Sequence, residues 1–240
     1  MYVTRDYRSF EEGHKLFPFQ VAIKETDIYI KACAKLENES LNFISFYRNQ
    51  IENYILAHPS FEKSLVPLPC DDSAPPIVQE MLNASSQAGV GPMAAVAGAI
   101  AEFVGRSLLK YSSEIIVENG GDIFVRASKE IIIKIFAGTS PLSQKIAIKV
   151  LPSEMPLGIC TSSGTVGPSL SFGKADAITI VSPSTALADS VATAVGNMIK
   201  KENDIPFGLK VAESITGVKG AIIIVGEKMG AWGNIELLKL

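Results

Sequence analysis

The chain has 240 residues, of which 47% are hydrophobic and 20% are charged, and its formal net charge is −3. This length is enough for one or two domains with a real core, and the apolar content excludes a disordered chain. A pI near 5.5 argues against a nucleic-acid partner or an anionic membrane surface. Three cysteines exclude a disulfide framework, and two histidines, His14 and His58, exclude a His-rich metal site.

The N-terminal segment lacks the pattern of a targeting signal. Residues 1–15 are charged throughout and contain no apolar run like that of a secretion signal. The longest stretch of low polarity, Val90 to Ala101, has about a dozen residues, whereas a membrane span needs about 20. We therefore expect a cytoplasmic protein with no membrane partner.

The first half of the chain mixes strand and helix patterns, with one connector rich in proline. Residues 19–32 predict a hairpin around Lys24–Asp27. Residues 37–59 predict a helix that Asn38 or Ser40 caps and Pro59 ends. The elements expected next are a connector at 64–76, a short helix at 77–84 and a long helix at 93–110.

One stripe of the long predicted helix consists of small residues that let another backbone approach closely: Ala94, Gly98, Ala101 and Gly105. The second half of the chain is rich in strands. Its expected elements are a hairpin turning at Asn119–Asp122, strands at 130–138, 145–152 and 176–183, a helix at 185–201, a helix near 209–215, a strand at 221–227, a Gly-rich turn around Trp232 and a last strand at 235–240. Antiparallel hairpins with a few long helices indicate an α+β protein whose helices group on one sheet face.

The first candidate for chemistry lies near the start of the helix predicted at 185–201. Asp189 and Thr193 are four residues apart, so a carboxylate and a hydroxyl share one helix face. A hard cation such as Mg²⁺ takes oxygen ligands, often one or two carboxylates together with water, phosphate or carbonyl groups. The alternative is an acidic residue favoured by the helix dipole, with Thr193 merely packed.

Two further motifs are suited to holding a ligand. Asn119, Gly120, Gly121 and Asp122 form a turn whose glycines leave backbone N–H groups accessible, although an ordinary hairpin turn has the same sequence. Thr161, Ser162, Ser163 and Gly164 place hydroxyls where a strand enters a loop, which suits a phosphate or a ribose, and equally an ordinary loop. Cys160, which precedes them, is expected to be a buried and inert thiol.

The order of these motifs is more specific than any one of them. A helix with Gly98-Ala99-Ile100-Ala101 is followed by Asn-Gly-Gly-Asp, then Thr-Ser-Ser-Gly, then Ala-Asp-x-x-Ala-Thr at residues 188–193. This order resembles the ApbE superfamily of Mg²⁺-dependent FAD:protein FMN transferases, over about residues 89–197. Within it the chain is most similar to the UPF0280 family, whose signatures resemble VGPMAAVAGAIAE, VENGGDI and CTSSGTVGPSLSFGKADA.

The resemblance implies a T-fold-like, ApbE-like α+β architecture with antiparallel sheets and long helices packed on one face. It implies one domain over residues 1–240, made of a hairpin and helix at 17–60, a connector at 64–76, a core with the motifs at 77–201 and a C-terminal part at 205–240. It assigns the metal role to Asp189 and Thr193, and ligand contacts to Asn119–Asp122 and Thr161–Gly164. The implied cofactors are Mg²⁺ and FAD, FMN or a nucleotide.

The chain also departs from the transferase pattern. Glu102-Phe103 stand where the transferases carry Lys-Gly, and no histidine follows His58, so the segment that supplies a histidine to their reaction centre is missing. We therefore expect binding of a metal and an anionic small molecule, with no catalytic residue assigned; the alternative is a non-catalytic flavin- or nucleotide-binding or accessory protein. The UPF0280 resemblance also implies a role in sulfide assimilation and homocysteine formation in anaerobes. The sequence leaves the oligomeric state open, with a homodimer as one alternative.

Overall fold

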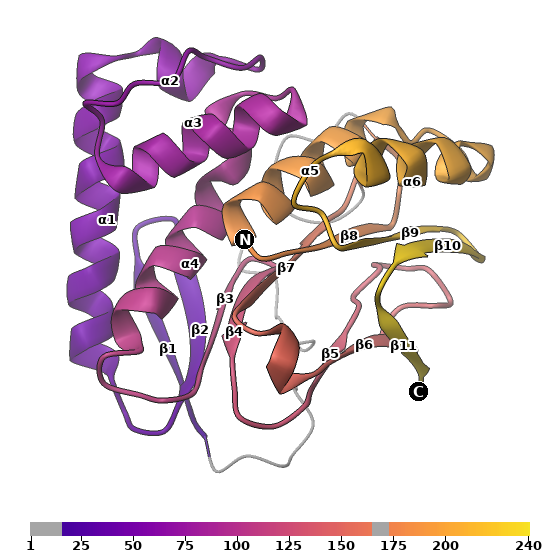
Figure 1. The fold of residues 1–240 in the computed structure, drawn as a ribbon, viewed down its shortest axis with the longest axis horizontal. Helices are drawn as coiled ribbons and strands as arrows, with labels where there is room; N and C mark the ends of the chain where they lie inside the picture. Colours follow the sequence, from indigo (N-terminus) through magenta and orange to yellow (C-terminus); the bar gives the residue numbers. More distant parts are fainter. Residues whose placement is uncertain (1–15, 165–172) are drawn as a thin grey trace.

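The fold consists of layers built around one large sheet. The computed structural model describes residues 16–164 and 173–240. Helices cover one face of an eight-stranded antiparallel sheet, and a three-stranded sheet packs against the other face (Figure 1). This arrangement confirms the expected α+β class with the long helices on one side of the sheet. Residues 165–172, which belong to the third UPF0280-like signature, lie outside the described residues, as does His14.

The large sheet has the order β1-β2-β3-β4-β7-β8-β9-β10, and every neighbouring pair is antiparallel. Its strands are β1 (Phe17–Ile23), β2 (Thr26–Ala32), β3 (Ile115–Asn119), β4 (Asp122–Arg126), β7 (Leu157–Ser162), β8 (Ala177–Ser182), β9 (Gly220–Val225) and β10 (Lys228–Gly233). The small sheet has the order β11-β6-β5, with β5 (Ile131–Lys134), β6 (Ile146–Val150) and β11 (Glu236–Lys239).

Six α-helices are present in the described residues. They are α1 (Glu37–Ala57), α2 (Ser60–Lys63), α3 (Pro76–Ala88), α4 (Val96–Leu108), α5 (Thr185–Met198) and α6 (Ile205–Ser214). Short 3₁₀ helices lie at Pro92–Ala95, Pro152–Glu154 and Glu202–Asp204. No single helix of residues 16–164 and 173–240 is long and apolar enough to span a membrane; only the pair Pro76–Ala88 and Pro92–Leu108, bent by 106°, meets those criteria together.

The central strands are buried on both faces because each face has its own core. In β3, Val117 packs among the helices while its neighbour Ile116 packs toward the small sheet. Successive side chains of a strand point to opposite faces, so one strand supplies both cores. All five residues of β3 are buried, including the polar pair Glu118 and Asn119.

Helices α4 and α5 cross at very short range, as the stripe of small residues predicts. A β-carbon on Gly98 would lie 2.5 Å from the Thr185 carbonyl oxygen and 2.8 Å from the Asp189 β-carbon. Farther along α4, a β-carbon on Gly105 would lie 2.3 Å from the Phe124 ring. Both contacts lie far inside normal packing distance, so glycine is required at these positions.

Several predicted boundaries are wrong. The long helix is not continuous from residue 93, because Pro92–Ala95 forms a 3₁₀ turn before α4 begins. Neither Asn38 nor Ser40 caps α1, since both lie inside the helix and Leu36 occupies the cap without a side-chain bond. Trp232 belongs to strand β10 rather than to a turn, because its backbone pairs with Ala221.

Other elements differ in length. The β1–β2 turn contains only Lys24 and Glu25, since Thr26 already pairs with Ile23. Helix α3 continues to Ala88, where Gly89 ends it in a left-handed conformation with φ 72°. The last helix begins at Ile205, with Pro206 in its first turn, and a short helix at Ser60–Lys63 follows Pro59.

The α4–α5 crossing is tested by two glycine substitutions. We expect Gly98→Ala to lower the free energy of unfolding by about 1–3 kcal/mol or more, because its β-carbon collides with the backbone of α5. Gly196→Ala in α5 is the control, since its β-carbon would meet nothing nearer than 3.7 Å, and it should be neutral or stabilising by up to about 1 kcal/mol. Urea denaturation measures both, and equal effects would contradict the close crossing.

Candidate functional site

The β3–β4 hairpin holds the first predicted motif in a tight turn. Asn119 and Asp122 pair directly across the hairpin, so their side chains share the face of the sheet that carries the helices. Gly120 and Gly121 have φ of 68° and 108°, the positive values that a two-residue hairpin turn of this kind requires. The Gly121 N–H donates to a Glu118 carboxylate oxygen at 2.9 Å, so this N–H is used within the hairpin.

Strand β7 brings the second predicted motif beside the turn. The Thr161 N–H donates to the Gly121 carbonyl at 3.2 Å, and Cys160 is paired with Asp122 in the strand register. Because side chains alternate along a strand, Cys160 faces the helices and the Thr161 side chain faces the other way. The hydroxyls of Thr161 and Thr179 lie 3.0 Å apart. Thr161 therefore adjoins the turn through its backbone.

The rest of that motif forms the end of β7 and the residues after it. Ser162 is the last residue of β7, and its hydroxyl lies close to Gly196 of α5. Ser163 and Gly164 follow the strand, and the Gly164 N–H donates to the Ala175 carbonyl at 2.9 Å. The structure thus brings Asn119–Asp122 together with Cys160 and the Thr161 backbone, whereas the Ser162 hydroxyl lies against α5 and the Gly164 N–H bonds to Ala175.

Helix α5 carries Asp189 to the same place. The Ser184 hydroxyl accepts from the Leu187 N–H and caps the start of α5, so that Asp189 lies in the second turn. An Asp189 carboxylate oxygen accepts from the Gly98 N–H at 2.9 Å, near the N-terminus of α4, whose dipole favours an anion. Thr193 is one turn farther along α5 on the same face and is half-buried.

Asp122 and Asp189 are close enough for each to feel the other's charge. Burial raises the pKa of Asp122 well above its ordinary value, the charges of Asp189 and Glu118 raise it further, and a hydrogen bond with Cys160 opposes the shift. Burial also raises the pKa of Asp189 to about 7, against the effect of the N–H groups of Gly98 and Ala97. Two buried carboxyls that resist ionisation together are suited to a cation between them.

Cys160, which lies beside Asp122 in the sheet, is a buried thiol. Its Sγ donates to the Thr185 carbonyl at 3.3 Å. Burial raises the pKa of Cys160 well above its ordinary value, and the charges of Asp122 and Asp189 act in the same direction. A thiol held in its protonated form is a poor nucleophile, which agrees with the expected inert role.

Glu118 is a site residue that the sequence motifs did not single out. Its side chain is only 1% exposed, and its bond to the Gly121 N–H fixes the turn. A signal was available, because a glutamate inside the apolar run Ile115–Asn119 is unusual for a strand buried on both faces.

Glu102 is buried and serves as a link between helices. One carboxylate oxygen accepts from the Thr185 N–H at 2.6 Å, at the N-terminus of α5, and the other pairs with Arg106 at 2.7 Å. The carboxylate thus satisfies a free N–H of α5 and faces its positive dipole end. Both oxygens of the Glu102 carboxylate are therefore engaged within the protein.

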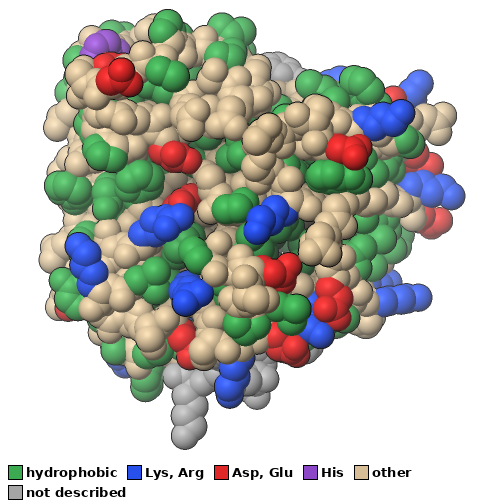
Figure 2. All heavy atoms as spheres, in the orientation of Figure 1, with side chains coloured by type: hydrophobic (Ala, Val, Ile, Leu, Met, Phe, Trp, Pro, Cys, Tyr) green, Lys and Arg blue, Asp and Glu red, His purple; other side chains and the backbone are tan. Residues whose placement is uncertain are grey.

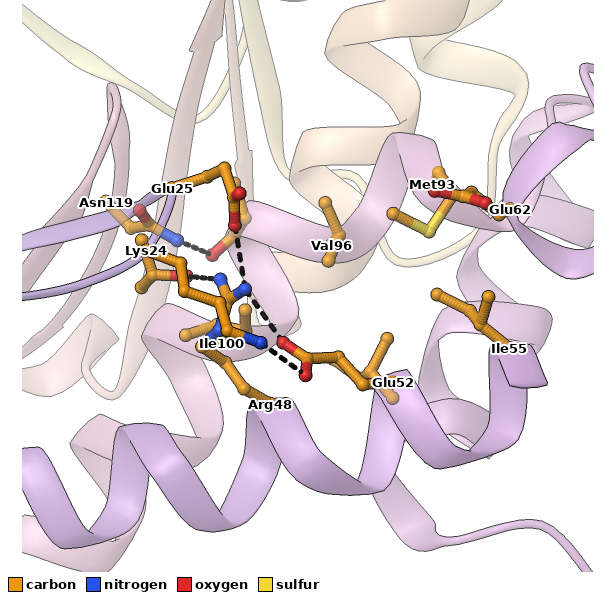
Figure 3. A pocket seen from close by; sticks show the side chains of 13 residues that line it. Lys24, Glu25, Arg48, Glu52, Ile55, Glu62, Met93, Val96, Ile100 and Asn119 are labelled. Atoms are coloured by element: carbon orange, nitrogen blue, oxygen red, sulfur yellow. Dashed lines mark hydrogen bonds and ion pairs between the residues drawn. The ribbon is translucent and has the colours of Figure 1, made fainter.

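A pocket of about 570 Å³ adjoins this site at Ala97 and Asn119 (Figure 3). The Asn119 side-chain amide donates to the Ala97 carbonyl at 3.0 Å, and Asn119 is 8% exposed. The N–H of the next residue, Gly98, reaches Asp189. The carboxylate site and the pocket therefore share one wall.

Figure 2 shows Lys and Arg side chains interspersed with Asp and Glu over one face of the molecule.

The fold is that of the ApbE proteins. The chain superposes on the apo form of the flavinyl transferase ApbE of Pseudomonas stutzeri with a TM-score of 0.57 and 15% identity, covering 91% of this chain and 94% of that one. The ApbE protein of Thermotoga maritima gives a TM-score of 0.60 at 11% identity, covering 90% and 96%. These structures define the class as an ApbE-like α+β protein.

Sequence comparison narrows the class to a family. A family model described as AbpE bacteria matches residues 8–216. A UPF0280 protein of Methanosarcina acetivorans is 41% identical over 196 residues, which is 80% of this chain and 76% of that one. Another, from Methanocaldococcus jannaschii, is 40% identical over 230 residues and 93% of each chain. The chain belongs to the UPF0280 family, within the ApbE-like superfamily.

The role of Glu102 is tested by reversing its charge. Glu102→Lys places a cation beside Arg106 and against the positive end of α5, so we expect a loss of more than about 3 kcal/mol in the free energy of unfolding. Glu102→Gln keeps an acceptor for Thr185 and should cost about 1–3 kcal/mol. The exposed Glu213→Lys is the control, expected to stay within about 0.5 kcal/mol. Wild-type stability of Glu102→Lys would contradict the link.

The raised pKa of Asp189 predicts a dependence of stability on pH. Between its unfolded value of 3.8 and its folded value of about 7, the folded chain holds a proton that the unfolded chain has released. Stability without metal should therefore fall as the pH rises from about 4 to about 7. Asp189 contributes about −1.4 kcal/mol per pH unit to this slope, and Asp122, whose pKa is also raised, makes it steeper. Urea denaturation at several pH values measures this slope.

The controls for this pH dependence use two Asp→Asn variants. Asp189→Asn should make the slope less negative by about 1.4 kcal/mol per pH unit because it removes one of two buried carboxyls with raised pKa values, Asp122 being the other. Asp71→Asn should leave it in place, since hydrogen bonds from Ser73 and Tyr54 lower the pKa of Asp71 instead. If the stability of the wild type instead rises with pH over this window, the raised pKa of Asp189 is contradicted.

Proposed function

We propose that the chain binds a divalent metal ion through Asp122 and Asp189 and, beside it, a small anionic molecule. The observation that supports this most strongly is the pair of buried carboxyls with raised pKa values. No Lys or Arg side chain of the described residues contributes to either shift. Two ionised carboxylates without a cation are costly in such an environment, and a divalent ion would remove the cost.

The donor set fits a hard cation of the Mg²⁺ type. Within residues 16–164 and 173–240, no group of three or more His, Cys, Asp or Glu side chains is arranged to hold a metal. This argues against a site of the zinc type with only protein ligands. Mg²⁺ commonly takes one or two carboxylates and keeps other positions for water and phosphate oxygens. Asp122 and Asp189 would hold the ion, with Thr193 one turn away as the predicted third oxygen.

The small number of protein ligands also supports an anionic ligand at the metal ion. Two carboxylates leave most positions of an octahedral ion open, and an anion completes both the coordination and the charge balance. When bound, the ion would polarise and orient the anionic group. The Gly120–Gly121 turn has no side chains that would obstruct a ligand at the edge of this site, and Cys160 and Thr161 of β7 lie next to the turn.

The proposal does not extend to flavin transfer. The position at which the transferases carry a lysine is here Glu102, which is buried and bonded to Arg106 and to the N-terminus of α5. This observation favours a second candidate, a protein that holds a flavin or nucleotide without turnover. Prolonged incubation of a bound ligand with candidate acceptors separates the two, since unchanged ligand supports the carrier role.

The metal site is tested by calorimetry with Mg²⁺, alone and together with ADP or FMN. We expect Asp189→Asn and Asp122→Asn to weaken Mg²⁺ binding by more than about tenfold, because each removes a ligand. Thr193→Val should weaken binding, whereas Thr193→Ser, which keeps the hydroxyl, should not. The exposed Asp72→Asn is the control for loss of a negative charge. Unchanged Mg²⁺ affinity in folded Asp189→Asn would refute the proposal.

A further inference from the structure

The pocket beside the carboxylate site has chemically different ends. At one end, residues of the β1–β2 turn and of α1 form a chain of ion pairs (Figure 3). Lys24 pairs with Glu52 at 2.8 Å, and Arg48 pairs with Glu52 at 2.9 Å and with Glu25 at 2.8 Å. This end therefore presents an ammonium and a guanidinium together with two carboxylates.

The opposite end carries a single carboxylate. Glu62 of α2 lines the pocket beside Met93, away from the ion pairs (Figure 3). Glu62 forms no ion pair with another described residue, and it is exposed. The two ends thus differ in character, because one has two cations paired with two carboxylates and the other has a carboxylate outside any ion pair of the described residues.

The wall between the ends is apolar. It is formed by α1, by the 3₁₀ turn before α4 and by the start of α4, through Ile51, Ile55, Met93, Val96 and Ile100. Apolar walls with a few polar groups at fixed positions are typical of pockets for small organic molecules, and about 570 Å³ lies within their usual size range. A ligand that lies along this wall would bury its own apolar part there.

The ion pairs leave the cationic end open to a ligand. The Glu25 side chain is 85% exposed, and an exposed ion pair contributes little, about 0–1 kcal/mol. Arg48 itself is only 13% exposed and is fixed by Thr26 and Glu52. An oxyanion of a ligand that displaces the exposed Glu25 therefore gains a well-positioned guanidinium, while Glu52 keeps its pairs with Arg48 and Lys24.

We propose that this pocket binds an elongated zwitterion, with a cationic group near Glu62, an oxyanion near Arg48 and Lys24, and an apolar chain between them. The lining contains three carboxylates and two cations, so a phosphate dianion would meet a surplus of negative charge. A zwitterion adds no net charge and places each of its ends against the opposite sign. This inference goes beyond the metal site and does not require the metal.

The test is calorimetry with ω-amino acids of increasing length, namely 4-aminobutanoate, 6-aminohexanoate and 8-aminooctanoate, in the presence of EDTA. We expect one length to bind at least tenfold more tightly than the alkylamine and the alkanoate of the same length, which each lack one charged end. Inorganic phosphate and AMP should bind more weakly. No binding by any of the three, or equal binding of the singly charged analogues, would overturn the proposal, as would preferred binding of phosphate or AMP.

Variants locate the ligand in the pocket. Glu62→Gln and Arg48→Met should each weaken binding of the preferred zwitterion at least tenfold, whereas Glu213→Gln, an exposed control, should not. Glu25→Gln removes the competing carboxylate and should tighten binding several-fold, which a purely structural ion pair would not do. Because Arg48→Met also removes contacts within the fold, the Glu25 and Glu62 variants, which alter exposed side chains, decide the outcome. Asp189→Asn should leave zwitterion binding intact, so the metal site and the pocket fail or succeed separately.

Discussion

The structure of the site depends on how closely α4 and α5 approach each other. Only a glycine at position 98 lets the backbone of α4 come within contact of Thr185 and Asp189. That approach places the Gly98 N–H on the Asp189 carboxylate, at a helix N-terminus that favours a negative charge. The same crossing lets Glu102 reach the first N–H of α5. One packing constraint therefore positions both the buried Asp189 carboxylate and the charged group that holds the two helices together.

Glu102 shows that a residue at the site of a superfamily motif need not act on the ligand. Its two oxygens are engaged by Arg106 and by the N-terminus of α5, so its charge is balanced inside the protein. A carboxylate balanced in this way does not repel an anion as an unpaired one would. At this position the difference from the transferase pattern is therefore a missing lysine, because the glutamate that replaces it serves the packing of α4 against α5.

Local patterns made much of this arrangement predictable. The Asn119–Asp122 turn needs positive φ, the stripe of small residues on α4 needs a close neighbour, and both features are visible in the sequence because they depend on residues near one another. The pocket was not predictable in this way. It joins the β1–β2 turn, Arg48 on α1 and Glu62 on α2, and only the tertiary packing of the hairpin against α1 brings them together. Likewise, the Thr161 side chain points away from the sheet face that carries Asp122 because of the register of β7, and no sequence motif encodes that register.

Charge balance suggests why the carboxylate site and the pocket lie side by side. Asp122, Asp189 and Glu118 concentrate negative charge at the end of the β3–β4 hairpin, and burial makes that charge costly. The cations that line the adjoining pocket, Lys24 and Arg48, are already paired with Glu25 and Glu52. They cannot neutralise the aspartates without giving up those partners. A divalent ion, as proposed, would let both aspartates ionise without breaking those pairs. It would leave the pocket, whose lining carries three carboxylates and two cations, to select the organic part of a ligand.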